Sequence, residues 1–359
     1  MATIAENLQR IQDAKADIAA AIVQKGGSVS GLIDTYADAV RALPSGGGEL
    51  TAEDMKYVSF TSASTMKLLP TIFQNADWSQ KTSMASCFSG CANVQEVSVP
   101  ATPNVTSFSA CFANCMSLVS VTIANMDKVQ ITQSCFSGCR MLKDVSLPAM
   151  PLVTTLSACF SGCSALTEIS LPALPKVTVM GLCFMGCTKL NKIALPDLPN
   201  AQSMVSCFTN CTSLTNVSLP ELPNVTTCGA MFSNCNSLTS VTFPNLDKVQ
   251  IMATTFNANR ALVNVELPDL PVVTNMSGCF AGCTSLQRLV IGNIGGTITS
   301  LTNWAISVCQ RLPAESLVGI LNALPETPVS KVCTLGATHL NKLSAEEKAI
   351  ASAKGWTLN

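Results

Sequence analysis

Residues 159–172 read Cys-Phe-Ser-Gly-Cys-Ser-Ala-Leu-Thr-Glu-Ile-Ser-Leu-Pro, and this pattern returns at a constant 24-residue interval along most of the chain. Its phenylalanine marks the interval nine times, with no insertion or deletion: Phe88, Phe112, Phe136, Phe160, Phe184, Phe208, Phe232, Phe256 and Phe280. A constant interval over nine copies means that each unit superposes on the next, which is typical of a solenoid. We therefore predict nine stacked coils over residues 81–296.

Each unit combines a short strand with a proline corner. Apolar residues nine and eleven positions after each Phe alternate with polar neighbours, as in residues 167–171. This alternation predicts a strand with one buried face, and strands of successive coils should pair in parallel. Proline then ends the strand in most units, because it lacks a backbone donor. Stacking would place the nine Phe rings in one continuous column.

Fifteen of the 18 cysteines fall at two repeat positions, directly before the Phe and three residues after it. Zinc between coils or disulfides within them would use such thiols. A thiol is also a small apolar side chain that fits a tight inner column. Thr255 and Asn259 replace both cysteines in one unit without compensation nearby, which a shared metal chain would not easily tolerate. We favour buried free thiols and predict no metal and no cofactor.

The run 159–172 resembles the BspA-like leucine-rich repeats of gut bacteria and their phages, whose usual pattern is Met-Phe-x-x-Cys-x-x-Leu-x-x-Val/Ile-x-Leu-Pro. The resemblance covers about three fifths of the chain and implies a leucine-rich repeat solenoid of nine 24-residue repeats with short parallel strands. Members of the family serve as adhesins, surface proteins and phage structural parts. Cysteine usually stands here where the family more often has Met, and Met231 keeps the commoner choice.

Residues 1–44 have a different periodicity and predict an N-terminal helical module. An apolar seam at heptad-like spacing is formed by Ile4, Leu8, Ile11, Ile18 and Ile22. The segment is similar to the N-terminal modules of phage tail and fibre proteins, which implies attachment to other virion proteins or oligomerisation as a homotrimer. The alternative is a helical cap that shields the first coil. Residues 45–80 are expected to be a linker and N-terminal cap.

Residues 297–359 predict an α/β C-terminal cap that closes the other end of the rod, since the 24-residue phase is lost after Ile294. Helices are expected at 313–324 and, behind a capping box, at 345–354, with a strand near 332–335. The cap is similar to the closing modules of phage-encoded relatives. The single histidine, His339, has no Cys, Asp or second His at useful spacing, so we expect it to be structural.

Composition excludes several functions. A net charge of −1 with 12% charged residues leaves no basic surface for nucleic acid, and no apolar run is long enough for a membrane span. Hydrolytic triads need a histidine base with a nucleophile partner, and Asp and Glu are scattered over variable repeat positions rather than concentrated in one coil. We therefore predict that the chain is not an enzyme.

The exposed side of the strands is the candidate binding face, because its polar residues vary in charge from coil to coil while the inner residues do not. Its central members are Lys143, Asp144, Thr167, Glu168, Asn191, Lys192, Thr215, Asn216, Thr239 and Ser240. The face contains no aromatic residue, so protein or glycan contacts through Ser, Thr and Asn are expected rather than sugar stacking.

Three functions fit these features. The first is a phage virion protein, a fibre or decoration subunit that projects its repeats toward a host surface protein or glycan. It is favoured by the fibre-like N-terminus, by the closing module and by a first segment without the basic head and apolar core of an export signal. The second is a BspA-like adhesin or secreted interaction protein at the bacterial cell surface. The third, which the absence of a catalytic motif argues against, is a carbohydrate-active enzyme on a solenoid scaffold.

Overall fold

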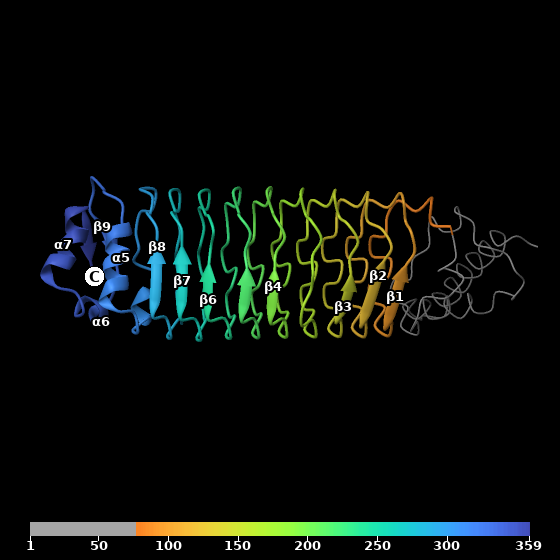
Figure 1. The fold of residues 1–359 in the computed structure, drawn as a ribbon, viewed down its shortest axis with the longest axis horizontal. Coiled ribbons are helices and arrows are strands. Elements are labelled where there is room, and N and C mark those ends of the chain that lie inside the picture. Colours follow the sequence, from red (N-terminus) through yellow and green to blue (C-terminus); the bar gives the residue numbers. More distant parts are fainter. Residues whose placement is uncertain (1–76) are drawn as a thin grey trace, which may run out of the picture.

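The computed structural model describes residues 77–359. The predicted helices of residues 1–44, with the seam residues Ile4, Leu8, Ile11, Ile18 and Ile22, lie outside this range. Within the range, the chain forms a rod of stacked coils that ends in a small cap of helices and strands (Figure 1). The predicted leucine-rich repeat solenoid is confirmed. Each coil is named below by its Phe.

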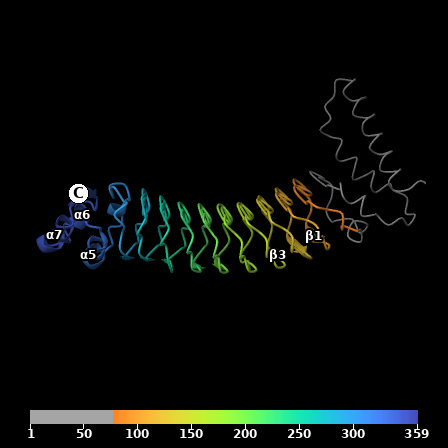
Figure 2. The same cartoon turned by 90° about the horizontal axis from the view of Figure 1, so that it is seen from above.

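Eight short strands follow one another along the rod, one in every coil except the Phe160 coil. In each, the Val, Ile or Leu nine residues after the Phe points inward and the residues beside it face solvent, as predicted from the alternation. The strands are β1 (Glu96–Val99), β2 (Ser120–Ile123), β3 (Asp144–Ser146), β4 (Lys192–Ala194), β5 (Asn216–Ser218), β6 (Ser240–Thr242), β7 (Asn264–Leu267) and β8 (Arg288–Ile291). The labelled strands β1 and β3 lie along one edge of the rod (Figure 2).

The strands pair in parallel and in the register of the repeat, for example Val97 with Val121. The paired strands form three separate sheets along the rod, β1-β2-β3, β4-β5 and β6-β7-β8. The predicted strand at residues 167–171 is wrong, because this segment of the Phe160 coil is not a strand, although the Thr167 carbonyl still accepts one backbone bond from the next coil. Ile169 is half-buried there, whereas the corresponding Ile193 in β4 is buried. The strand side alone therefore does not hold successive coils together.

A second hydrogen-bonded ladder runs through the return leg of the coils, and no sequence pattern indicated it. Single parallel bridges join residues five positions before each Phe, without a break from Ser83 to Asn275. The position is occupied by Ser, Thr, Ile, Val or Asn, so no side-chain type marks it. This second ladder is continuous where the strand ladder is interrupted.

The tight turn around each Phe uses left-handed backbone two residues before and two residues after the ring. Glycine or asparagine fills the second position in all coils but one, because these residues adopt positive φ at low cost. Leu182 adopts φ 61° at the first position, a strained conformation for a large side chain. The bonds between coils hold it in place: Phe184 N–H donates to the Cys207 carbonyl and Gly186 N–H to that of Thr209, both at 2.8 Å.

The nine Phe rings form the predicted column. Successive ring centroids from Phe88 to Phe232 are 5.0 to 5.5 Å apart and the rings are nearly parallel. The spacing widens to 6.2 Å between Phe232 and Phe256, where Phe243 packs edge-on against both rings. Trp304 lies one repeat interval after Phe280 and meets it edge-on, at 6.2 Å and 76°. The ring position of the repeat therefore extends ten residues beyond Ile294.

The C-terminal cap covers this end of the column. Helix α5 (Ala314–Ala323) packs on β8 in place of a further strand, and the short η2 (Ile306–Val308) precedes it. Two strands, β9 (Lys331–Cys333) and β10 (Trp356–Leu358), pair in parallel. Helices α6 (Ala337–Leu340) and α7 (Ala345–Ala353) lie between them in sequence. The expected strand and both expected helices are confirmed to within two residues at each end.

Named side chains stabilise the cap internally. The predicted capping box opens α7, with Glu347 N–H donating to Ser344 Oγ at 3.1 Å and Ser344 N–H to the Glu347 carboxylate at 2.8 Å. Trp356 is buried and its indole N–H donates to the Pro325 carbonyl at 2.8 Å, while that of Trp304 donates to Thr334 at 2.9 Å. These indole bonds join segments far apart in sequence.

Three lysines add a further set of cross-links in the cap. Each ammonium group donates to two carbonyl oxygens that are two residues apart in an earlier segment. The contacts run from Lys331 to Gly296 and Ile298, from Lys342 to Gln310 and Leu312, and from Lys354 to Asn322 and Leu324. The last pair of carbonyls belongs to the C-terminal end of α5, where a positive charge also complements the helix dipole.

Candidate functional site

The ten residues of the predicted binding face form two neighbouring columns on the strand side of the rod, and all ten are exposed. The column seven positions after the Phe contains Lys143, Thr167, Asn191, Thr215 and Thr239. The column eight positions after it contains Asp144, Glu168, Lys192, Asn216 and Ser240. The structure brings residues of five successive coils together on one polar surface.

Backbone pairing sets the spacing of these columns. Lys192 pairs with Asn216 across β4 and β5. Thr215 donates twice to the Asn191 carbonyl, through N–H at 2.8 Å and Oγ1 at 2.9 Å. Asn191 N–H donates in turn to the Thr167 carbonyl at 3.2 Å. The polar columns therefore continue through the coil that has no strand.

Charge changes along this face. Asp144 and Glu168 are acidic, Lys192 is basic, and the following residues of that column are an amide and a hydroxyl. Farther along the rod, Arg288 forms an ion pair with Glu266, and both side chains are largely exposed. A ligand lying lengthwise on the face would meet charged groups at one end and neutral hydrogen-bonding groups toward the middle.

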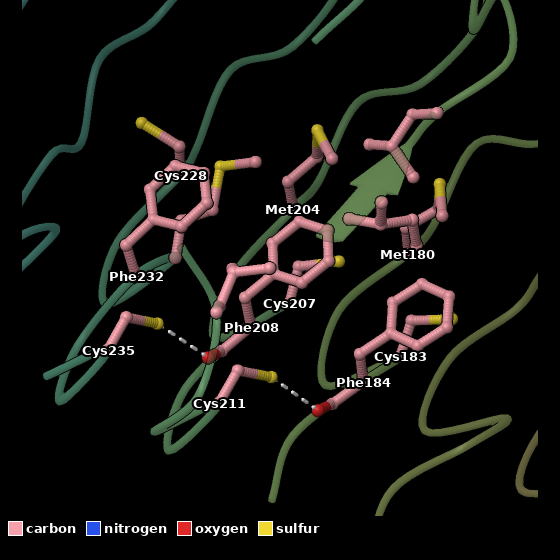
Figure 3. Packing of buried hydrophobic residues seen from close by; sticks show 14 of the residues in the cluster. Met180, Cys183, Phe184, Met204, Cys207, Phe208, Cys211, Cys228, Phe232 and Cys235 are labelled. Carbon is pink, nitrogen blue, oxygen red and sulfur yellow. Dashed lines mark hydrogen bonds between the residues drawn. The ribbon is translucent and has the colours of Figure 1, made fainter. Parts of the chain in front are cut away.

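The cysteines line the interior. All 18 lie within residues 77–359, where they are buried and form no disulfide. The thiol three residues after a Phe donates to the carbonyl of the Phe one coil earlier, at 3.0 to 3.2 Å (Figure 3); the pairs are Cys115–Phe88, Cys139–Phe112, Cys163–Phe136, Cys187–Phe160, Cys211–Phe184, Cys235–Phe208 and Cys283–Phe256. Sequence reasoning predicted buried free thiols but missed this donor role.

Burial keeps these thiols protonated. It raises the pKa of Cys159 and of Cys211 to about 12. Because the thiolate is the reactive and metal-binding form, a protonated buried thiol is chemically inert. Within residues 77–359, no three or more His, Cys, Asp or Glu side chains are grouped so that they could hold a metal ion.

The donor role explains the one coil that lacks both repeat cysteines. Asn259 Nδ2 donates to the Phe232 carbonyl at 2.9 Å, in place of the missing thiol. Thr255 Oγ1 bonds the carbonyls of Met252 and Cys228. Asn259 Oδ1, however, is buried without a hydrogen-bond partner. The amide thus preserves the bond between coils but leaves one polar atom unsatisfied.

The Phe232 coil shows a second compensation. Most coils have Met, Leu or Phe four residues before the ring Phe and Cys directly before it, as Met204 and Cys207 do. Here the two are exchanged, with Cys228 at the first position (Figure 3) and Met231 at the second. Both side chains are fully buried. The exchange conserves the total side-chain volume, which the packed interior requires.

His339 lies in the cap, where α6 packs against η2. Its Nε2 is 3.2 Å from the Ile306 carbonyl, and its Nδ1 is buried without a partner. Burial lowers the pKa of this imidazole, and nearby Lys342 lowers it further, although the bond to Ile306 opposes both. The neutral His339 ring bonds the Ile306 carbonyl and so joins α6 to η2. This is a structural role, as predicted from the sequence.

Stacked parallel coils with inner columns of Phe, Leu and Cys define a leucine-rich repeat protein. The model of the BspA type leucine rich repeat region matches residues 79–181 and 177–313, with six copies. The chain therefore belongs to the BspA type leucine-rich repeat family.

The chain is similar to several solved structures of leucine-rich repeat proteins, of which three are described here. A leucine-rich repeat protein from Bacteroides ovatus is 18% identical, with 78% of this chain and 88% of that chain covered and a TM-score of 0.36. A leucine rich cell surface protein from Faecalibacterium prausnitzii is 20% identical, with 58% and 82% covered and a TM-score of 0.22. A leucine-rich repeat protein from T. pallidum is 18% identical, with 71% and 81% covered and a TM-score of 0.25.

The search of curated proteins found no match. Among the helices of residues 77–359, none combines the length and the apolar character that a membrane crossing needs.

Proposed function

We propose that this protein is a non-enzymatic adhesion or interaction protein that binds a surface protein or glycan through its strand face. The single observation that carries the proposal is the pair of exposed polar columns on the strand side. A repeated scaffold holds them in fixed register, yet their chemistry changes from coil to coil. A rigid surface of this kind loses little conformational freedom on binding.

The composition of the face supports a polar ligand. Hydroxyl and amide groups dominate the coils of Phe184, Phe208 and Phe232, and they can both donate and accept hydrogen bonds. Aromatic rings are absent from the two columns, so recognition would depend on hydrogen bonds and on the charges of Asp144, Glu168 and Lys192.

The setting we favour is the bacterial cell surface, in keeping with the BspA type repeat. The virion setting predicted from the sequence depends on residues 1–44, which the structure does not describe, and on the likeness of the C-terminal cap to phage closing modules. No comparison supports it. Attachment through the N-terminal helices, as a trimer or to other proteins, remains a separate proposal.

The experiment measures binding of the full chain to an array of immobilised glycans and extracellular matrix proteins. A strand-face variant, Asp144→Lys with Glu168→Lys and Lys192→Glu, should lose at least about tenfold in affinity for any captured ligand. A corner variant of identical charge changes, Asp197→Lys with Glu221→Lys and Lys176→Glu, should bind like the parent. Equal loss in both variants, or no captured ligand, would count against the strand face.

A further inference from the structure

The rod has one side without any charged residue. In all nine coils, the ten positions from six residues before the Phe to three after it contain no Asp, Glu, Lys, Arg or His. The charged residues of the repeat region lie on the strands, the corners and the segments next to them. We call the outward residues two to six positions before the Phe the return-leg face.

Four large apolar side chains are exposed on this face. They are Ile131, Leu182, Val205 and Ile251, with 36 to 41% of their surface accessible. Ile251 lies over the neighbouring coil, since a Cβ on Gly229 would be 3.7 Å from its Cγ2 atom. Exposed apolar groups on a surface without charges are typical of a protein–protein interface.

Two of these residues are equally exposed and follow nearly the same sequence. Ile131 and Ile251 are five coils apart, and both are 41% exposed. Each ends the sequence Asn-x-Asp-Lys-Val-Gln-Ile, at 125–131 and at 245–251. The six residues that precede the two isoleucines are therefore the same except at one position, whereas the residues that follow them differ.

The contacts of the two segments also match. Lys128 Nζ donates to Asn104 Oδ1 at 2.8 Å, and Lys248 Nζ to Asn224 Oδ1 at 2.6 Å. Asn125 Oδ1 accepts from the Thr102 N–H, and Asn245 Oδ1 from the Leu222 N–H, both at 2.8 Å. The return-leg face therefore carries the same apolar feature twice.

The placement of the four residues has an approximate two-fold symmetry. Ile131 belongs to the third coil and Ile251 to the eighth, so their midpoint lies between the fifth and sixth coils. Leu182 and Val205 belong to those two central coils. An interface between two copies that uses the same patch on both requires this kind of self-complementary surface.

We propose that the return-leg face binds a second copy of this chain, side by side and antiparallel, with Ile131 of one copy against Ile251 of the other. The coils of a second copy follow one another at the same interval, so the coils of the two copies can stay in register over the whole contact. The absence of charge removes like-charge repulsion between identical faces.

The available area suits such a dimer. Nine coils at about 4.8 Å and a face about 15 Å wide give roughly 650 Å² per copy, or about 1,300 Å² in total, within the range of stable interfaces. The strand face stays free, because nearly half a coil separates Ser240 from Ile251. The dimer would present two antiparallel strand faces.

The test is the mass of the full chain by sedimentation velocity across a range of concentrations. Ile131→Lys and Ile251→Asp should each raise the dimer dissociation constant at least about tenfold and halve the mass relative to the parent. The mass of each single variant is compared with that of the parent as a ratio. Any additional assembly through the N-terminal helices is the same in both and does not change this ratio. Val290→Asp is the matched control, because Val290 is 42% exposed but lies on the strand side in β8.

Combining Ile131→Lys and Ile251→Asp in one chain should restore the parental mass, because the antiparallel contact brings the introduced lysine of one copy against the introduced aspartate of the other. A parallel contact would place like charges together, and the double variant would then stay dissociated. The proposal is wrong if the parent has the mass of its single variants, if Val290→Asp dissociates it equally, or if the double variant does not reassociate.

Discussion

The thiol of Cys187 donates to the carbonyl oxygen of Phe160 at 3.1 Å, and this bond joins two coils directly beneath the column of rings. The same carbonyl also accepts the N–H of Cys163 at 3.1 Å. In most coils, the turn around the Phe is thus linked to the next coil by a thiol donor as well as by backbone hydrogen bonds. The position three residues after the Phe therefore requires a small buried donor.

Replacing Asn259 by cysteine should stabilise the protein. The change keeps a donor for the Phe232 carbonyl and removes the buried, unpaired Oδ1 atom, whose desolvation costs about 1 to 3 kcal/mol. We expect the free energy of unfolding in urea to rise by about 1 kcal/mol. Asn259→Ala, which removes the donor as well, should not be stabilising. A clear loss of stability in Asn259→Cys would contradict this role of the position.

Phe184→Ala should be strongly destabilising, because its ring is fully buried between those of Phe160 and Phe208. A cavity in the middle of the column should cost about 3 to 5 kcal/mol. Phe243→Leu is the control, since most other coils place an aliphatic residue at that position, and it should cost about 1 kcal/mol. Urea unfolding measures both, and an unchanged midpoint for Phe184→Ala would rule out the column as the main core.

The exchange of Cys228 and Met231 predicts strong coupling between the two sites. Cys228→Met alone adds volume beside the retained Met231 and should cost about 1 to 3 kcal/mol. Met231→Cys alone leaves a cavity. The double variant restores the arrangement of most coils and should be within about 1 kcal/mol of the parent. A double-mutant cycle in urea measures the coupling, and additive losses would show that the two side chains pack independently.

Stability should fall at alkaline pH. Burial raises the pKa of the thiols in the folded state, so the unfolded chain loses its thiol protons first, near pH 8.5 to 9. Stability is therefore complete below this range and lost as pH rises above it, by about 1.4 kcal/mol per pH unit for each buried thiol. The urea midpoint at about pH 9.5 should be well below that at about pH 7.5, and Cys159→Ser should reduce the difference. Equal midpoints would contradict the buried thiols.

The sequence predicted the parts of the fold that a constant interval determines. Phenylalanines at a constant interval must stack, and Trp304 at the same interval was a usable signal that went unrecognised. The return-leg ladder left no signal, because backbone groups make its bonds and side chains as different as Ser, Ile and Asn occupy the position. The missing strand at residues 167–171 was equally hidden, since those residues alternate like their neighbours in sequence.

The candidate binding face was predictable as a surface. Polar residues beside inward-pointing Val and Ile side chains had to be exposed, and all ten are. Its two columns follow from the register of the repeat. What binds there depends on a ligand whose chemistry the chain does not encode in any motif. The two isoleucines of the return-leg face share a preceding sequence that could have been noticed, but their exposure is a property of the fold.

The most direct test of the structural account is a count of reactive thiols in the full chain with a thiol reagent, before and after unfolding in urea without reductant. The account predicts almost no fast-reacting thiol in the native protein and 18 in the unfolded chain, because all 18 cysteines are buried and none forms a disulfide within residues 77–359. Fewer than 18 after unfolding would reveal disulfides or bound metal, and several fast-reacting thiols in the native state would show that the column is open to solvent. Either result would contradict a core built on buried thiol donors.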